Sequence, residues 1–162
     1  MVEMLSPTRT LLAAASATFA PSTAKVAVFK PVDGCAKSDE GNPQLQEQIA
    51  ICQAALEKIS GLREDYRPKF RYEENQIWAD AYVQQKYGFL RILIAQKEFR
   101  TAGETLTKPV CAQFSLAKQH FASIPSIADE REWFGEADLN LRNMADRITA
   151  RCAAGSPEPM TD

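Results

Sequence analysis

Four cysteines constrain the fold of this 162-residue chain more than any other feature of its sequence: Cys35, Cys52, Cys111 and Cys152. An even number of cysteines in a chain of one-domain length indicates a disulfide framework if the protein is exported to an oxidising compartment. No C-x-x-C pair is present, and the spacing of the cysteines matches no zinc module or thioredoxin-like redox motif. We therefore expect two structural disulfides, no metal site and no cofactor.

Residues 1–24 have the organisation of a secretory signal peptide. A basic residue, Arg9, precedes the apolar segment Leu11–Ala20, and Ser22–Ala24 forms a small-x-small cleavage site. The apolar segment is shorter than the ~20 residues needed to span a bilayer, so we expect no transmembrane span. The prediction is a periplasmic or secreted protein. The alternative is a cytoplasmic protein with an amino-terminal tail, because Glu3 lies where signal peptides prefer positive charge.

The charge and glycine content exclude several other classes of protein. The chain carries 19 Lys and Arg residues against 21 Asp and Glu residues, a net charge of −2, so it has no basic field for a nucleic acid backbone. Only 7 glycines are present, and long segments lack proline, which argues against a sheet of many short strands. We expect an all-α fold, a helical bundle of antiparallel α-hairpins with no nucleic-acid partner.

Apolar spacing and helix-capping residues predict about five helices. They are expected over residues 42–61, 73–95, 98–107, 110–122 and 127–152. Pro43 begins the first helix and Gly61 is expected to end it, whereas Gly135 is expected to bend or interrupt the last one. The wide apolar face of the second helix predicts that other helices cover it on more than one side.

The remaining segments are expected to lie outside the helical domain, which spans residues 42–153. Residues 25–41 are predicted to form an extended arm that ends at Pro31, followed by a polar loop. Residues 154–162 are predicted to be a disordered tail, because they contain a glycine and two prolines and lie at the chain end.

The predicted helices favour one cysteine pairing among the three that four cysteines allow. Cys35 lies in the loop before the first helix, and that loop can fold back onto Cys52 on the apolar stripe of the helix. Cys111 lies in the first turn of one helix and Cys152 in the last turn of another, and these ends are neighbours in an antiparallel hairpin. We predict Cys35–Cys52 and Cys111–Cys152. The alternative is that the cysteines are free thiols that pack as small apolar residues.

Several segments resemble a known helical repeat. Ile49–Leu56 follows the pattern I-A-x-C-x-x-A-I with Cys35 upstream, Ala79–Tyr82 is similar to A-x-A-Y, and Lys97–Ala102 is similar to a K-G-D-Y-x-x-A turn without its glycine. Residues 35–108 thereby resemble small secreted bacterial tetratricopeptide-repeat (TPR) proteins, although no second copy is visible. The resemblance implies α-hairpins whose concave groove binds extended peptides or helices.

No catalytic set is evident in the sequence, so we expect a protein that is not an enzyme. His120 is the only histidine, no G-x-S-x-G elbow is present, and bridged cysteines leave no thiol nucleophile. The acidic pairs Glu73–Glu74 and Asp129–Glu130 lie at predicted helix starts, where negative charge favours the helix dipole.

Aromatic residues supply the remaining functional hypothesis. Trp78, Tyr82, Lys86 and Trp133 are candidate partner-binding residues, because exposed aromatic side chains often anchor protein interfaces. The alternative is that the aromatic side chains are buried between helices. We therefore expect an exported adaptor that binds another protein in the bacterial periplasm. The alternative is a small-ligand carrier or enzyme accessory protein with an apolar pocket near Trp78 and Trp133. Lys86, Arg91 and Lys97 are further candidates for lining a groove.

Overall fold

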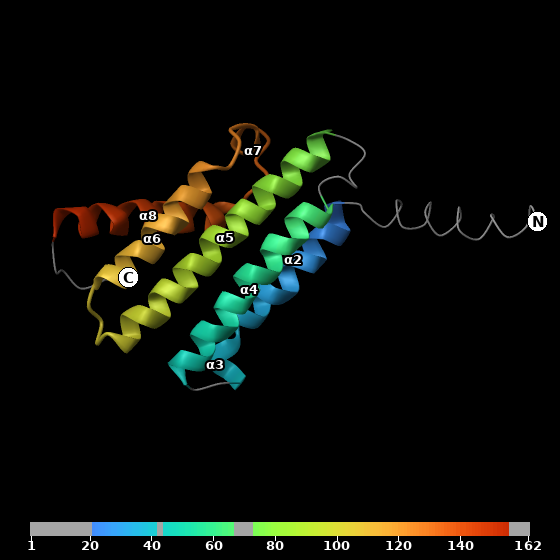
Figure 1. The fold of residues 1–162 in the computed structure, drawn as a ribbon. Coiled ribbons are helices and arrows are strands. Elements are labelled where there is room, and N and C mark those ends of the chain that lie inside the picture. Colours follow the sequence, from blue (N-terminus) through green and yellow to red (C-terminus); the bar gives the residue numbers. More distant parts are fainter. Residues whose placement is uncertain (1–20, 42–43, 67–72, 156–162) are drawn as a thin grey trace, which may run out of the picture.

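The computed structural model describes residues 21–41, 44–66 and 73–155, and all of their regular secondary structure is helical (Figure 1). The all-α prediction is therefore confirmed. In chain order the helices are α2 (Pro21–Ala36), α3 (Ser38–Gly41), α4 (Leu45–Tyr66), α5 (Glu73–Thr101), α6 (Lys108–Ala122), α7 (Ile127–Glu130) and α8 (Glu136–Ala154). Within these ranges, none of the helices combines the length and apolar character required to cross a membrane.

The long helix α5 is the centre of the bundle (Figure 1). Its 29 residues extend about 44 Å, at a rise of 1.5 Å per residue. Helices α2 and α4 pack on one side of it and α6 and α8 on the other, which confirms that its wide apolar face is covered on more than one side. Leu90 and Ile94 enter the core with α2 and α4, whereas Ile92 and Phe99 enter the core with α6 and α8.

Both disulfides are present in the predicted pairing. Cys35–Cys52 joins the end of α2 to α4 with a Cα–Cα distance of 4.7 Å, and Cys111–Cys152 joins the start of α6 to the end of α8 with a Cα–Cα distance of 5.9 Å. Among the described residues no cysteine is free. Each half of the bundle thus contains one covalent link between two helices.

The extended arm predicted for the first part of residues 25–41 is wrong, because these residues belong to α2. Val28, Val32 and Cys35 recur at steps of four and three, and all three are buried against α4 and α5. Pro31 lies inside α2 and removes one helical hydrogen bond, yet the helix continues through it. Burial of this apolar face compensates for the lost bond. The predicted loop is also largely helical, since α2 reaches Ala36 and α3 follows.

Gly61 does not end a helix as predicted. Helix α4 passes through it and continues to Tyr66, and a Cβ atom at Gly61 would meet nothing within 4 Å. A glycine in an exposed helix interior costs only about 1 kcal/mol, which the helix-favouring residues Leu62, Arg63 and Glu64 compensate. The predicted start at residues 42–43 lies outside the described residues.

The predicted second and third helices form one element, α5. Residues 96 and 97 contain no glycine or proline that would stop the helix, and Lys97 and Phe99 are both buried in its last turns. The chain turns at Gly103 and Glu104, which have the positive φ angles 68° and 59°. Residues 97–101, expected in a turn between two repeat helices, are therefore helical.

Helix α6 and the interruption at Gly135 agree with the sequence predictions. The backbone N–H of Val110 donates to the hydroxyl of Thr107 at 3.4 Å, so Thr107 caps α6. Gly135 is the N-cap of α8, which separates α8 from the short helix α7. Residues 1–20 of the predicted signal peptide and residues 156–162 of the predicted tail lie outside the described part of the chain.

Candidate partner-binding site

Three of the four predicted partner-binding residues form a continuous strip on α5. Trp78, Tyr82 and Lys86 are separated by four residues and therefore share one face of the helix. The rings of Trp78 and Tyr82 stack with 5.2 Å between centroids. The Nζ atom of Lys86 lies 5.3 Å from the Tyr82 centroid and 5.8 Å from the Phe89 centroid. We call Trp78, Tyr82, Lys86 and Phe89 the α5 strip.

The α5 strip is bordered by an acidic residue of α8. Asp138 Oδ1 lies 4.0 Å from Lys86 Nζ, and both side chains are only partly exposed. Burial, and then the negative charge of Asp138, raises the pKa of Tyr82 to about 12. The Tyr82 phenol therefore stays neutral at physiological pH, and the strip combines aromatic rings with one ammonium group.

A buried glutamine fixes α8 beside the strip. Gln85 is 0% exposed, and its Nε2 donates to the backbone oxygen of Asp138 at 3.2 Å. Its Oε1 accepts from Arg142 Nε at 2.9 Å. Arg142 Nη1 also contacts Asp129 Oδ1 at 2.8 Å, and its guanidinium lies over the ring of Phe134. This network connects α5, α7 and α8 before any partner binds.

Replacing Arg142 by alanine is expected to lower the free energy of unfolding by about 1–3 kcal/mol. The substitution leaves the carbonyl oxygen of Gln85 buried without the donor it has in the native chain. Arg147→Ala, on the exposed face of the same helix, is the matched control and is expected to change stability by less than about 0.5 kcal/mol. Urea denaturation measures both, and equal losses would exclude a structural role for the network.

Trp133 does not join the other predicted residues. It lies half-buried in the connection between α7 and α8, where its backbone N–H donates to Ala128. Among the described residues, no ring contact connects Trp133 to the α5 strip. The sequence prediction placed Trp133 and Phe134 in the helical segment before the interruption at Gly135, but α7 ends at Glu130 and both residues lie in the loop between α7 and α8.

The sequence prediction missed Gln85, Asp138 and Arg142, and it placed Lys97 incorrectly. Lys97 does not line a groove, because it is buried and its Nζ donates to Gln48 Oε1 at 2.9 Å. A buried lysine or glutamine is rare enough that a sequence pattern assigns it to the surface. The one sequence signal for their burial is position, because Gln85 and Lys97 both lie among the apolar residues of α5.

A second polar cluster lies on the other side of α5, facing α6. The rings of Tyr87 and His120 stack with 4.9 Å between centroids, and His120 Nδ1 lies 3.0 Å from Gln84 Oε1. Arg91 Nη1 donates to Gln113 Oε1 at 3.2 Å. Burial, and then the positive charge of Arg91, lowers the pKa of His120. His120 is therefore a largely neutral imidazole at neutral pH that packs on the ring of Tyr87 and the amide of Gln84.

The depressed pKa of His120 predicts that stability falls in mild acid. The unfolded chain binds a proton at this residue more readily than the folded chain does, so the stabilisation is fully present above the unfolded value of 6.5. It is lost as the pH falls from that value through the lower folded pKa. We expect the native chain to lose more stability than His120→Gln between about pH 7.5 and pH 5 in urea denaturation. Any loss of stability that arises from Arg91 or Glu98 occurs in both proteins. Equal losses of stability in the native chain and the variant would therefore contradict a role for His120.

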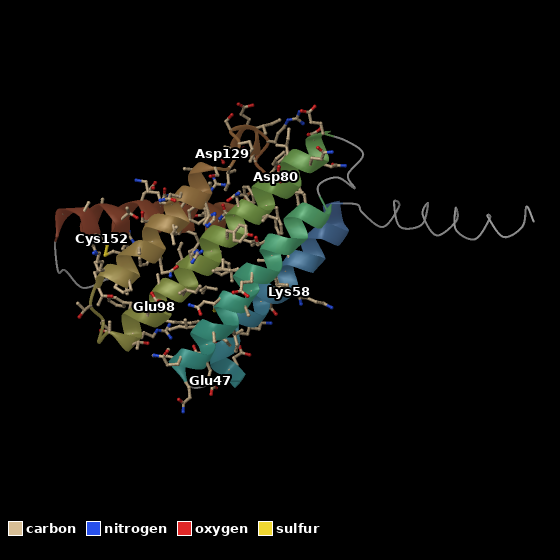
Figure 2. The ribbon with its side chains drawn as sticks, in the orientation of Figure 1. Glu47, Lys58, Asp80, Glu98, Asp129 and Cys152 are labelled. Atoms are coloured by element: carbon tan, nitrogen blue, oxygen red, sulfur yellow. A yellow bond between two sulfur atoms is a disulfide. The ribbon has the colours of Figure 1, made fainter. Side chains whose placement is uncertain are left out.

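Four buried side-chain atoms among the described residues have no hydrogen-bond partner: Arg91 Nε, Glu98 Oε2, Arg142 Nη2 and Thr149 Oγ1. Arg91 Nε and Glu98 Oε2 are buried without a hydrogen bond, although the two charged groups attract each other across two turns of α5. Figure 2 shows Glu98 and Asp80 near opposite ends of this helix. Within the described ranges, no group of three or more His, Cys, Asp or Glu side chains is arranged to hold a metal ion.

Comparison with family models, with curated proteins and with solved structures found no significant match to this chain. The resemblance of residues 35–108 to TPR proteins therefore stays a prediction.

Proposed function

We propose that this protein is an exported α-helical adaptor of the bacterial periplasm, without enzymatic activity, which binds another protein through the α5 strip. The observation that carries the proposal is the arrangement of Trp78, Tyr82 and Lys86 on one face of α5. Tryptophan and tyrosine are enriched among the residues that dominate binding energy at protein interfaces.

Most of the strip is already packed in the free protein: Tyr82 is 7% exposed, and Trp78 and Phe89 are half-buried against the core formed by α2, α4 and α5, so a partner would reach mainly the edge of Trp78 and the Lys86 ammonium. Trp78 is held by its stack on Tyr82, and Lys86 is held between two rings and Asp138. Ordering flexible side chains at an interface costs about 0.5–1.5 kcal/mol for each one, so a strip ordered in the free protein favours association.

The two disulfides support export to an oxidising compartment. Cleavage after Ala24 would remove the first four residues of α2. The buried side chains described in α2 begin at Val28, so the mature chain keeps the contacts that hold this helix in the bundle. A signal peptide of residues 1–24 is therefore compatible with the fold.

The helix pair α5–α6 supports a TPR-like mode of recognition. The two helices are connected by six residues and pack along each other as an antiparallel hairpin (Figure 1). A TPR-like groove would accept an extended or helical segment of a partner. The alternative function, a carrier with an apolar pocket near Trp78 and Trp133, is not proposed because no described contact brings these two residues together.

Site-specific photocrosslinking in the native host tests the proposed function. A photoreactive amino acid is placed at position 139, the exposed residue that follows Asp138 in α8, and at position 58 as a control. Lys58 is exposed on α4 (Figure 2). We expect a discrete crosslinked protein from position 139 and none from position 58. Equal crosslinking from both positions would contradict recognition through the strip.

A strip variant then connects the crosslink to the predicted contact. Trp78→Ala is expected to weaken binding by about 2 kcal/mol or more, or about 30-fold, if Trp78 is a principal anchor. Binding of the identified partner to purified protein measures this change, and circular dichroism confirms that the helical content is retained. Unchanged affinity in a folded variant would exclude the strip as the interface.

A further inference from the structure

The two disulfides differ in their access to solvent. Cys35 and Cys52 are both 0% exposed and lie within the core formed by α2, α4 and α5. Cys111 and Cys152 are both partly exposed, and Cys152 only borders the core formed by α5, α6 and α8. A reductant in solution can therefore approach the second disulfide in the folded protein, whereas the first is covered.

The exposed disulfide connects two helix ends of opposite polarity. Cys111 is in the first turn of α6, three residues after Lys108, and Cys152 is in the last turn of α8, beside Arg151. Figure 2 shows Cys152 at this end of α8, close to the start of α6. Each cysteine has a basic residue nearby in sequence, so the helix ends distinguish them: a helix N-terminus stabilises a thiolate, whereas a helix C-terminus disfavours one.

We propose that Cys111–Cys152 is a site of thiol–disulfide exchange with an external dithiol reductant, and that Cys35–Cys52 is not. A thiolate of the reductant attacks Cys152 Sγ, the Sγ–Sγ bond breaks, and Cys111 leaves as a thiolate. The second thiol of the reductant then attacks the mixed disulfide and releases Cys152. The reductant becomes a disulfide, and its two protons are taken up by Cys111 and Cys152, so two electrons are transferred in total.

The direction of attack follows from the helix ends. Exchange is faster when the leaving thiol has the lower pKa, and of these two cysteines Cys111 has the position that stabilises a thiolate. Attack on Cys152 is therefore favoured over attack on Cys111. The mixed disulfide is expected to form on α8.

Reduction would release only one end of α8. The N-terminal half of this helix stays attached through Arg142, Gln85 and Asp138. The C-terminal half keeps the packing of Ala145 and Ile148 but loses its covalent link to α6. Exchange at this site therefore changes the mobility of α8 and leaves the core formed by α2, α4 and α5 intact.

Reduction of the native protein with increasing dithiothreitol, followed by alkylation and peptide mass mapping, tests the proposal. We expect Cys111 and Cys152 to be alkylated at least about tenfold faster than Cys35 and Cys52, because the buried pair reacts only after the fold opens. The same experiment in urea above the unfolding midpoint is the control, and there the difference should disappear. Simultaneous opening of both disulfides in the folded protein, or a difference that persists in urea, would overturn the proposal.

Two further measurements test which sulfur is attacked and how reduction affects α8. Glutathione, quenched with acid early in the reaction, is expected to form its mixed disulfide on Cys152, and a predominant adduct on Cys111 would overturn the direction of attack. Hydrogen exchange of the reduced protein should increase in the C-terminal half of α8 and stay unchanged in α4. An equal increase in hydrogen exchange in both helices would show that the disulfide stabilises the whole fold and does not act on α8 alone.

Discussion

Replacing both Cys35 and Cys52 by alanine is expected to lower the free energy of unfolding by about 3 kcal/mol or more. The disulfide closes a 17-residue separation, and the chain-entropy relation gives about 3 kcal/mol for a loop of that length. Both sulfurs are fully buried, so their removal also leaves a cavity between α2 and α4. Urea denaturation of the purified oxidised protein measures the loss.

The second disulfide provides the matched comparison. Cys111→Ala with Cys152→Ala opens a 41-residue separation, for which the same relation gives about 4 kcal/mol, but removes sulfurs that are partly exposed. We expect both double variants to be destabilised, and only the Cys35 and Cys52 variant to disturb the core of α2 and α4. A loss of less than about 1 kcal/mol in that variant would contradict the structural role assigned to the buried disulfide.

Substituting Gly88 is the second change with a large expected effect. Gly88 is buried in the middle of α5, and a Cβ atom there would overlap the ring of Phe121 on α6. Phe121 is itself buried, so the ring has little room to move. Gly88→Ala is expected to cost about 1–3 kcal/mol through overpacking, and Gly88→Leu more, even though alanine and leucine favour a helix.

Gly61→Ala is the control for helix propensity. Gly61 is exposed inside α4, and nothing lies within 4 Å of the position that its Cβ would take. This substitution is expected to stabilise the protein by about 0.5–1 kcal/mol, opposite in sign to Gly88→Ala. Thermal or urea unfolding distinguishes the two. Stabilisation by both substitutions would show that α5 and α6 are not in close contact at Gly88.

The sequence predicted those parts of the fold that depend on local residue spacing and on the residues at helix ends. The cysteine pairing was predictable because each cysteine could be assigned to a helix end, a loop or an apolar stripe, and only some of these positions can meet. The start of α6 was predicted to within two residues from Pro109, and the interruption at Gly135 from the low helix propensity of glycine, but the capping role of Thr107 was missed because Thr107 was assigned to the preceding helix.

The incorrect predictions concern elements whose boundaries depend on tertiary packing. Pro31 and Gly61 normally stop helices. Helix α2 continues through Pro31 because its apolar face is buried, and α4 continues through Gly61 because a glycine inside an exposed helix costs only about 1 kcal/mol. The single helix α5 was divided in the prediction at residues 96 and 97, where Lys97–Ala102 resembles a turn between two repeat helices, and Lys97 is instead buried. Its hydrogen bond to Gln48, a residue of another helix, is not visible in the local sequence.

In the candidate site, too, contacts within one helix were predicted and contacts between helices were missed. Trp78, Tyr82 and Lys86 share a face because their spacing of four residues is a property of the helix itself. The Gln85–Arg142 hydrogen bond joins residues 57 positions apart, so no local pattern indicates it. Trp133 was misplaced because the predicted helix was expected to continue up to Gly135, whereas α7 ends at Glu130.

The intact mass of the protein recovered from its native host tests the central claim, an exported protein held by two disulfides. We predict a chain that lacks residues 1–24 and gains about 4 Da on reduction, two hydrogens for each disulfide. Alkylation before reduction should add no label. A chain that retains residues 1–24 and carries four alkylatable thiols would contradict both export and the disulfides.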